Sequence, residues 1–245
     1  MTSRETPYSD HAIYALGDSA MTISLGEQID PRTHAQIIAM RRWIDANRFD
    51  GLIDCITAYS SLTVLYDVSS VKTSIGQTSV HVYISKYLEN AYRLGALQVT
   101  DTKGRLVTIP VCYADALAPD MEEVCRTTGL TREEVITLHT GRTYPVYMVG
   151  FLPGFAYLAQ VDDRLVVSRK LRPRARVEAG SVGVAGVQTG IYPVASPGGW
   201  QIIGRTPLAM FDVKADPPVL LATGDEVQFR AIDYAAYQQL VHDRI

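Results

Sequence analysis

Apolar residues in the first hundred positions follow two different periods. Short runs rich in β-branched and aromatic residues, which are typical of strands, occupy 13–15, 21–25, 52–57 and 61–66. Asp30 and Pro31 suit an N-cap and a first helical position, and apolar residues at helical spacing follow them. A second helix is predicted over about 73–94, ended by Gly95. Strands carrying two helices in this order predict a small α+β sandwich.

The pattern changes near residue 99. A short helix is predicted over 119–129, and Thr131 with Glu134 fits the capping box of a second one. Strands and tight turns then dominate from Tyr144 to Phe211, before a further strand and a closing helix. We therefore predict two domains, an N-terminal α+β domain over 1–97 and a strand-rich domain over 98–245.

The stretch 180–211 organises the second domain. It holds seven of the 18 glycines, with valine and isoleucine interleaved among them, and one of the two tryptophans, Trp200. Glycine allows positive φ and close backbone approach, so this pattern predicts short, tightly turned strands packed against one another. The stretch is either a structural β-barrel corner or a backbone-lined ligand cleft.

Composition narrows the class of protein. The 245 residues are 47% apolar and 20% charged, which allows a packed core. A net charge of -3 argues against nucleic acid as a partner. Three widely spaced cysteines indicate reduced thiols, and there is no apolar run of membrane-spanning length or signal-peptide h-region. We expect a cytoplasmic protein that binds neither nucleic acid nor membrane.

Most familiar catalytic motifs are absent. The glycine spacing matches neither the P-loop nor the dinucleotide-binding fingerprint, and 179–183 lacks one glycine of a nucleophile elbow. Ser69 and Lys72 match S-x-x-K without its companion motifs, so we interpret that match as chance. The five histidines form no metal-binding pair, so no protein-bound metal is expected.

A candidate site begins with charged residues at alternating positions. Arg172, Arg174, Arg176 and Glu178 would project from one face of a strand. Guanidinium groups bind carboxylate or phosphate through two hydrogen bonds, and Glu178 could order them or transfer a proton. The competing interpretation is an edge strand whose charges prevent aggregation.

Other candidates lie in the glycine-rich stretch and before it. Gln188 could orient a substrate amide, and the turn formed by Ser196, Gly198, Gly199 and Trp200 could bind an anion through its amides. We interpret Trp200 as a core anchor rather than a stacking platform. His139 follows a predicted helix end, where it is either a cation that stabilises the helix dipole or a general base.

The same residues carry a family resemblance. The chain resembles the family of 5-oxoprolinase B subunits, also called allophanate hydrolase subunit 1 or Kip inhibitor-like, from about Ala12 to Phe229. The motifs include YMVGFLPGF at 147–155 and SPGGWQIIGRTP at 196–207, with shorter ones at 173–177, 179–183 and 188–193. The resemblance implies an α+β N-terminal domain and a cyclophilin-like β-barrel domain.

The resemblance also implies a function. Members act with the C and A subunits of 5-oxoprolinase to open 5-oxoproline to glutamate, with ATP as co-substrate of the complex. The chain is then one part of a hydrolase and is inactive alone, with Glu178 and His139 as catalytic candidates and Arg174, Arg176 and the 188–200 residues as substrate-binding candidates. Two alternatives stay open, a regulator that inhibits a sensor histidine kinase and a component of an allophanate or urea amidolyase-type hydrolase.

The chain departs from the family pattern at four positions. Ala156 and Ala159 stand where proline and glycine are usual, Glu178 replaces a usual proline, and Val187 replaces a usual acidic residue. The last two touch the predicted cleft, which weakens Glu178 as a catalytic residue of the whole family.

Overall fold

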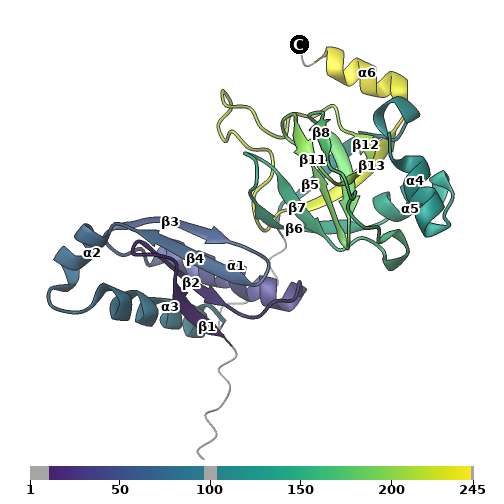
Figure 1. The fold of residues 1–245 in the computed structure, drawn as a ribbon. Helices are drawn as coiled ribbons and strands as arrows, with labels where there is room; N and C mark the ends of the chain where they lie inside the picture. Colours follow the sequence, from purple (N-terminus) through teal and green to yellow (C-terminus); the bar gives the residue numbers. More distant parts are fainter. Residues whose placement is uncertain (1–10, 97–103, 244–245) are drawn as a thin grey trace, which may run out of the picture. The chain divides into compact units, whose positions relative to one another are not determined.

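The computed structural model describes residues 11–96 and 104–243. The chain divides into two compact units, Met1–Thr102 and Lys103–Ile245 (Figure 1). The boundary predicted between residues 97 and 98 lies outside the described residues. Among the helices that are described, none is both long and apolar enough to cross a membrane.

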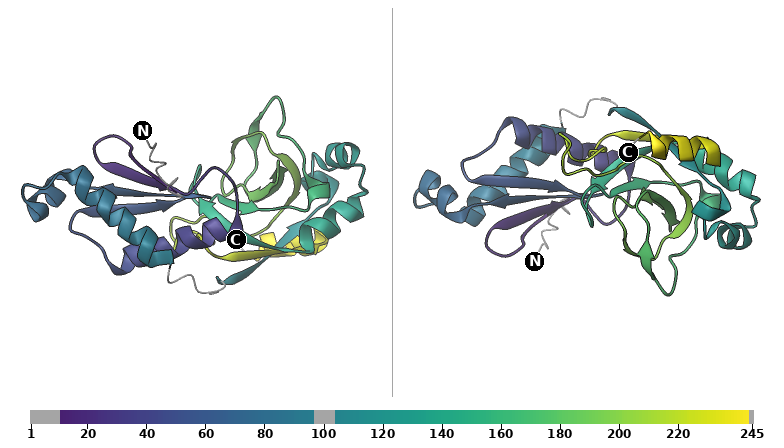
Figure 2. Two further views of the ribbon diagram at one scale, coloured as in Figure 1. Left: turned by 90° about the horizontal axis from the view of Figure 1, so that it is seen from below. Right: turned by 90° about the horizontal axis from the view of Figure 1, so that it is seen from above.

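The first unit is a four-stranded antiparallel sheet covered by helices. Its strand order is β1-β2-β4-β3. The strands are β1 (Ala12–Ala15), β2 (Ala20–Ser24), β3 (Leu52–Thr57) and β4 (Ser61–Tyr66), and the helices are α1 (Pro31–Ala46), α2 (Val68–Ile75) and α3 (Val80–Ala96). Both α1 and α3 contact the sheet and each other, as the turned views in Figure 2 show. Leu62, Val64 and Tyr66 alternate along β4 toward this core.

Local signals place α1 where the sequence predicts it. The Asp30 carboxylate accepts hydrogen bonds from the backbone amides of Arg32 and Thr33 at 2.8 and 2.9 Å. The single helix predicted over 73–94 is wrong, because the chain forms two helices and α2 ends at Gly76 with φ +63°. Gly95 lies inside α3, where an added Cβ would come within 3.0 Å of the Met40 Cα on α1.

The second unit contains a closed seven-stranded barrel and helices that contact its strands. The order around the barrel is β10-β7-β6-β13-β5-β12-β9, and the β5–β13 pair is parallel. Its strands are β5 (Leu106–Cys112), β6 (Thr143–Val149), β7 (Ala156–Ala159), β9 (Ser181–Ala185), β10 (Gln188–Ile191), β12 (Gln201–Arg205) and β13 (Glu226–Ile232). A separate pair joins β8 (Arg174–Val177) to β11 (Ser196–Gly198). The α+β fold class with a barrel in its second part is confirmed.

Among residues 104–243, three helices accompany the barrel, α4 (Met121–Thr128), α5 (Arg132–Thr140) and α6 (Tyr234–His242). Two 3₁₀ turns span Asp115–Leu117 and Asp163–Leu165. The predicted end of α4 and the predicted start of α5 are confirmed. Gly129 ends α4 in the left-handed conformation, and Thr131 with Glu134 forms a complete capping box.

Candidate functional site

The outer wall of the barrel explains much of the glycine-rich stretch. Gly190 on β10 pairs with Gly183 on β9, so two residues without side chains lie opposite each other. The rings of Trp200 and Phe155 fill this space, and a Cβ added to Gly190 would come within 3.0 Å of Trp200 Cζ3 and 3.2 Å of Phe155 Cζ. Trp200 is therefore a buried anchor of the wall.

The predicted anion-binding turn is packed in the same way. Ser196 is buried, and a Cβ on Gly198 would come within 2.4 Å of the Tyr192 hydroxyl. The Gly199 carbonyl accepts a hydrogen bond from the Lys170 amide at 2.7 Å. Gly198 thus allows close packing against Tyr192; anion binding by the turn stays a prediction.

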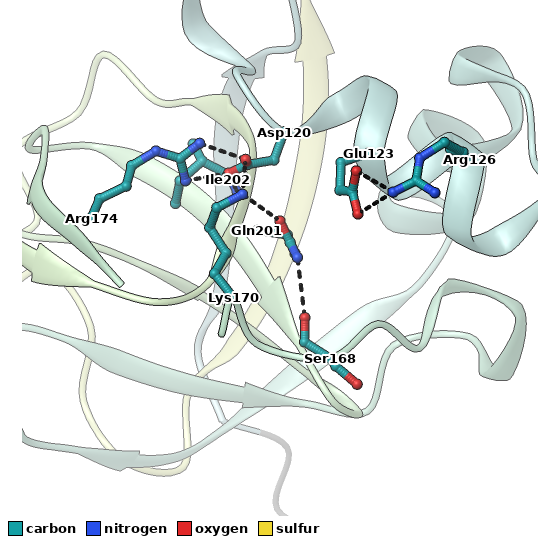
Figure 3. A network of polar contacts seen from close by, with 8 residues as sticks. All are labelled: Asp120, Glu123, Arg126, Ser168, Lys170, Arg174, Gln201 and Ile202. Atoms are coloured by element: carbon teal, nitrogen blue, oxygen red, sulfur yellow. Dashed lines mark hydrogen bonds and ion pairs between the residues drawn. The ribbon is translucent and has the colours of Figure 1, made fainter. Parts of the chain in front are cut away.

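Asp120 is the centre of a polar network that links three elements. It precedes α4, yet its side chain makes no capping hydrogen bond. Its carboxylate instead accepts hydrogen bonds from Lys170 Nζ at 2.7 Å and from Arg174 Nη1 and Nη2 at 2.6 and 2.5 Å (Figure 3). The Ile202 amide on β12 donates a further one at 2.7 Å. One carboxylate thus joins α4, β8 and β12.

The charge balance of this network is uneven. Asp120 is only 2% exposed, and burial alone would raise the pKa of its carboxyl. The hydrogen bonds from Arg174, Lys170 and Ile202 outweigh burial and hold that pKa below its ordinary value. The ionised carboxylate therefore binds two cations, Lys170 and Arg174.

Arg174 consequently has a structural partner that the sequence pattern did not predict. Arg176 and Glu178 form an exposed ion pair with each other at 2.6 Å, and this pairing lowers the pKa of the Glu178 carboxyl. The strand is shorter than predicted, since β8 covers Arg174–Val177 and Arg172 precedes it. The alternating charges therefore point to different surroundings, Arg174 to a buried carboxylate and Arg176 to solvent.

His139 lies inside the barrel unit and is fully buried. The Tyr113 hydroxyl lies 2.7 Å from Nδ1, and Nε2 lies 2.9 Å from the Thr189 hydroxyl, which donates to the Gly183 carbonyl at 3.0 Å. Because Thr189 uses its proton on that carbonyl, Nε2–H donates to Thr189 and Nδ1 accepts from Tyr113. Burial lowers the pKa of His139 to about 3, so the ring is neutral and the predicted dipole-stabilising cation is wrong. Full burial also argues against a general base that reaches substrate.

Two of the three cysteines have thiols that resist ionisation. Burial raises the pKa of the Cys55 thiol to about 12 and raises that of Cys125 as well. Across 11–96 and 104–243, no three His, Cys, Asp or Glu residues are grouped so that they could hold a metal ion. Gln188 begins β10, opposite Ala159 and Ala185, and is partly buried.

A cleft lies beside the Asp120 network. It has a volume of about 480 Å³, with one wall from α4 and the other from 167–172. Figure 3 shows Lys170, Gln201 and Ser168 on one side and Glu123 on α4 on the other. The sequence pattern indicated none of Asp120, Lys170 and Gln201. The run of five cations from Arg169 to Arg176 was the available signal for this part of the site.

The α+β unit and the barrel together match a carboxyltransferase domain. The sequence matches the family described as "Carboxyltransferase domain, subdomain C and D" over residues 11–221. It is 43% identical over 233 residues to the 5-oxoprolinase B subunit of Bacillus subtilis, covering 94% of this chain and 97% of that protein. The chain belongs to the family of 5-oxoprolinase B subunits, as the motifs indicated.

Two further comparisons agree. The 5-oxoprolinase B subunit of Haemophilus influenzae is 35% identical over 218 residues, which cover 89% of this chain and 96% of that protein. The crystal structure of TTHA0988 superimposes with a TM-score of 0.73 at 34% identity over 87% of this chain. This chain spans 40% of the length of that longer protein.

Proposed function

We propose that this chain is the B subunit of an ATP-dependent 5-oxoprolinase, which opens the lactam of 5-oxo-L-proline to L-glutamate. The observation that carries the proposal is the 43% identity to a 5-oxoprolinase B subunit over 94% of the chain. ATP is the co-substrate of the complex, whose other members are the C and A subunits, and the complex works in the cytoplasm.

The chemistry of the described residues favours a catalytic site completed by a partner. A lactam is resonance-stabilised, so its opening needs activation of the amide oxygen and groups that hold a carboxylate and a developing phosphate. This chain offers cations, but the buried His139 is neutral and the pKa values of Cys55 and Cys125 are raised. We therefore assign it a binding and positioning role.

Reconstitution tests the proposal. The purified chain is mixed with the A and C subunits, and glutamate release from 5-oxo-L-proline is measured together with ADP release. We expect turnover that needs ATP and all three proteins, and none from this chain alone. Equal turnover by the other two proteins without this chain would refute the assignment.

A further inference from the structure

The cleft between α4 and 167–172 carries more positive charge than its surroundings neutralise. Asp120 is shared by Lys170 and Arg174, and Arg126 already binds both carboxylate oxygens of Glu123 at 2.7 and 2.6 Å. Arg172 has no hydrogen-bond or ion-pair partner among the described residues. Three cations, Arg169, Lys170 and Arg172, thus line the cleft, against one lining carboxylate, that of Glu123.

Hydrogen bonds hold the backbone of the cationic wall, the side of the cleft formed by 167–172. The Lys170 amide donates to the Gly199 carbonyl at 2.7 Å, and Gln201 Nε2 donates to the Ser168 carbonyl at 3.2 Å. The Arg169 guanidinium lies over the Trp200 ring, 5.8 Å from its centroid. A wall fixed in this way loses little conformational freedom when a ligand binds.

Lys170 connects the wall to the buried network. Its ammonium has three N–H donors, of which one binds Asp120 at 2.7 Å and another lies 3.4 Å from Gln201 Oε1. Its side chain is 26% exposed, so the third donor is available at the cleft. A partly buried cluster with two cations for one carboxylate is suited to a second anion.

The cleft has the size and lining of a small-molecule site. Its volume of about 480 Å³ lies within the usual range for ligand pockets, about 300 to 1,000 Å³. Ser168 and Thr127 add hydroxyl groups to the cationic donors, while Val124, Val167 and Leu171 supply apolar wall. We propose that this cleft binds a small molecule through a carboxylate or phosphate group, which Arg172 and Lys170 contact.

The nature of that molecule rests on the proposed function. In lactam opening, 5-oxoproline and glutamate carry carboxylates, whereas ATP, ADP and inorganic phosphate carry phosphoryl oxygens. Guanidinium groups bind both kinds of oxyanion. Measuring which of these compounds binds to the single chain distinguishes a carboxylate ligand from a phosphate ligand.

The test uses the full chain in low-salt buffer and titrates 5-oxo-L-proline, L-glutamate, ADP and inorganic phosphate separately by calorimetry. We expect saturable 1:1 binding of the carboxylates or of the phosphates. Arg172→Gln should weaken this binding at least tenfold, because it removes a cation that contacts the anion. The variant should fold like the wild type, since Arg172 has no structural partner to lose. Arg230→Gln removes the same charge from an exposed position on β13, outside the cleft, and should leave binding unchanged.

Two results would overturn the proposal that the cleft binds an anion. One is the absence of saturable binding by all four compounds, and the other is an equal loss of binding in Arg172→Gln and Arg230→Gln. The proposed function fails separately, if the three-protein mixture does not open 5-oxoproline although the single chain binds an anion at the cleft.

Discussion

The indole of Trp200 lies against Gly190 so closely that a Cβ on this glycine would come within 3.0 Å of Cζ3. The Ala156 carbonyl oxygen would lie equally close to that Cβ. Neither neighbour can retreat easily, because Trp200 is buried beside Phe155 and Ala156 belongs to the paired strand β7. The packing of the barrel wall thus requires a residue without a side chain at position 190.

Gly190→Ala should therefore destabilise the barrel by about 1 to 3 kcal/mol, the usual cost of overpacking a tight core. Urea unfolding followed by tryptophan fluorescence measures the change. Gly150→Ala is the matched control, because nothing lies within 4 Å of its added Cβ. Equal unfolding midpoints for the two variants would contradict this account of the wall.

Elements whose signals are local could be predicted from the sequence. Asp30 with Pro31, and Thr131 with Glu134, satisfy helix-end amides within a few residues, so their patterns suffice. The break between α2 and α3 was missed, because the apolar face that predicts the helix begins only at Val80, and Gly76 within the predicted range was not interpreted as a helix end. Gly95 was taken for a helix end, although it gives room for the backbone of α1.

The site was harder to predict, because its partners are far apart in the chain. Asp120 lies at the acidic start of the helix predicted over 119–129, yet its carboxylate binds side chains that lie 50 and 54 residues further on. No local pattern specifies such pairing. The arginine-rich stretch was recognised, but the sequence could not show which arginine is used to hold the fold.

Arg174→Met should lower stability by about 2 to 3 kcal/mol, because it removes two charge-assisted hydrogen bonds from buried Asp120 while keeping the apolar stem. The loss is partial, since Lys170 still pairs with the carboxylate. Chemical unfolding of the full chain measures it. Arg176→Met is the control; it loses only an exposed pair and should leave the midpoint unchanged. An unchanged midpoint in Arg174→Met would show that the network adds nothing to the fold.

His139 should make stability depend on pH in a defined window. Its pKa is about 3 in the folded chain, against an ordinary value of 6.5, so between these values the unfolded chain binds the extra proton. The histidine's contribution is then fully present above pH 6.5 and is lost as the pH falls toward 3, by up to about 1.4 kcal/mol per pH unit.

The measurement compares unfolding free energies of wild type and His139→Gln from about pH 7.5 to about pH 4, which covers most of this window. The wild type should lose more stability than the variant on acidification, since carboxyl groups titrate in both and cancel. His81→Gln, which replaces an exposed histidine on α3, should keep the wild-type slope. Parallel curves for wild type and His139→Gln would show that the buried ring does not control this dependence.

Arg176 and Gln188 are the predicted substrate-binding side chains that can be removed without taking apart the Asp120 network. Arg176 loses only an exposed ion pair, so Arg176→Met alone should unfold at nearly the wild-type midpoint, and the midpoint of Arg176→Met with Gln188→Ala is measured beside its activity. If both line a site completed by partner proteins, kcat/KM for 5-oxo-L-proline in the three-protein mixture should fall at least tenfold. Arg230→Gln supplies the control for a lost surface charge. Full activity in the double variant would remove both residues from the site and leave the cleft beside Lys170 as the place to look for substrate contacts.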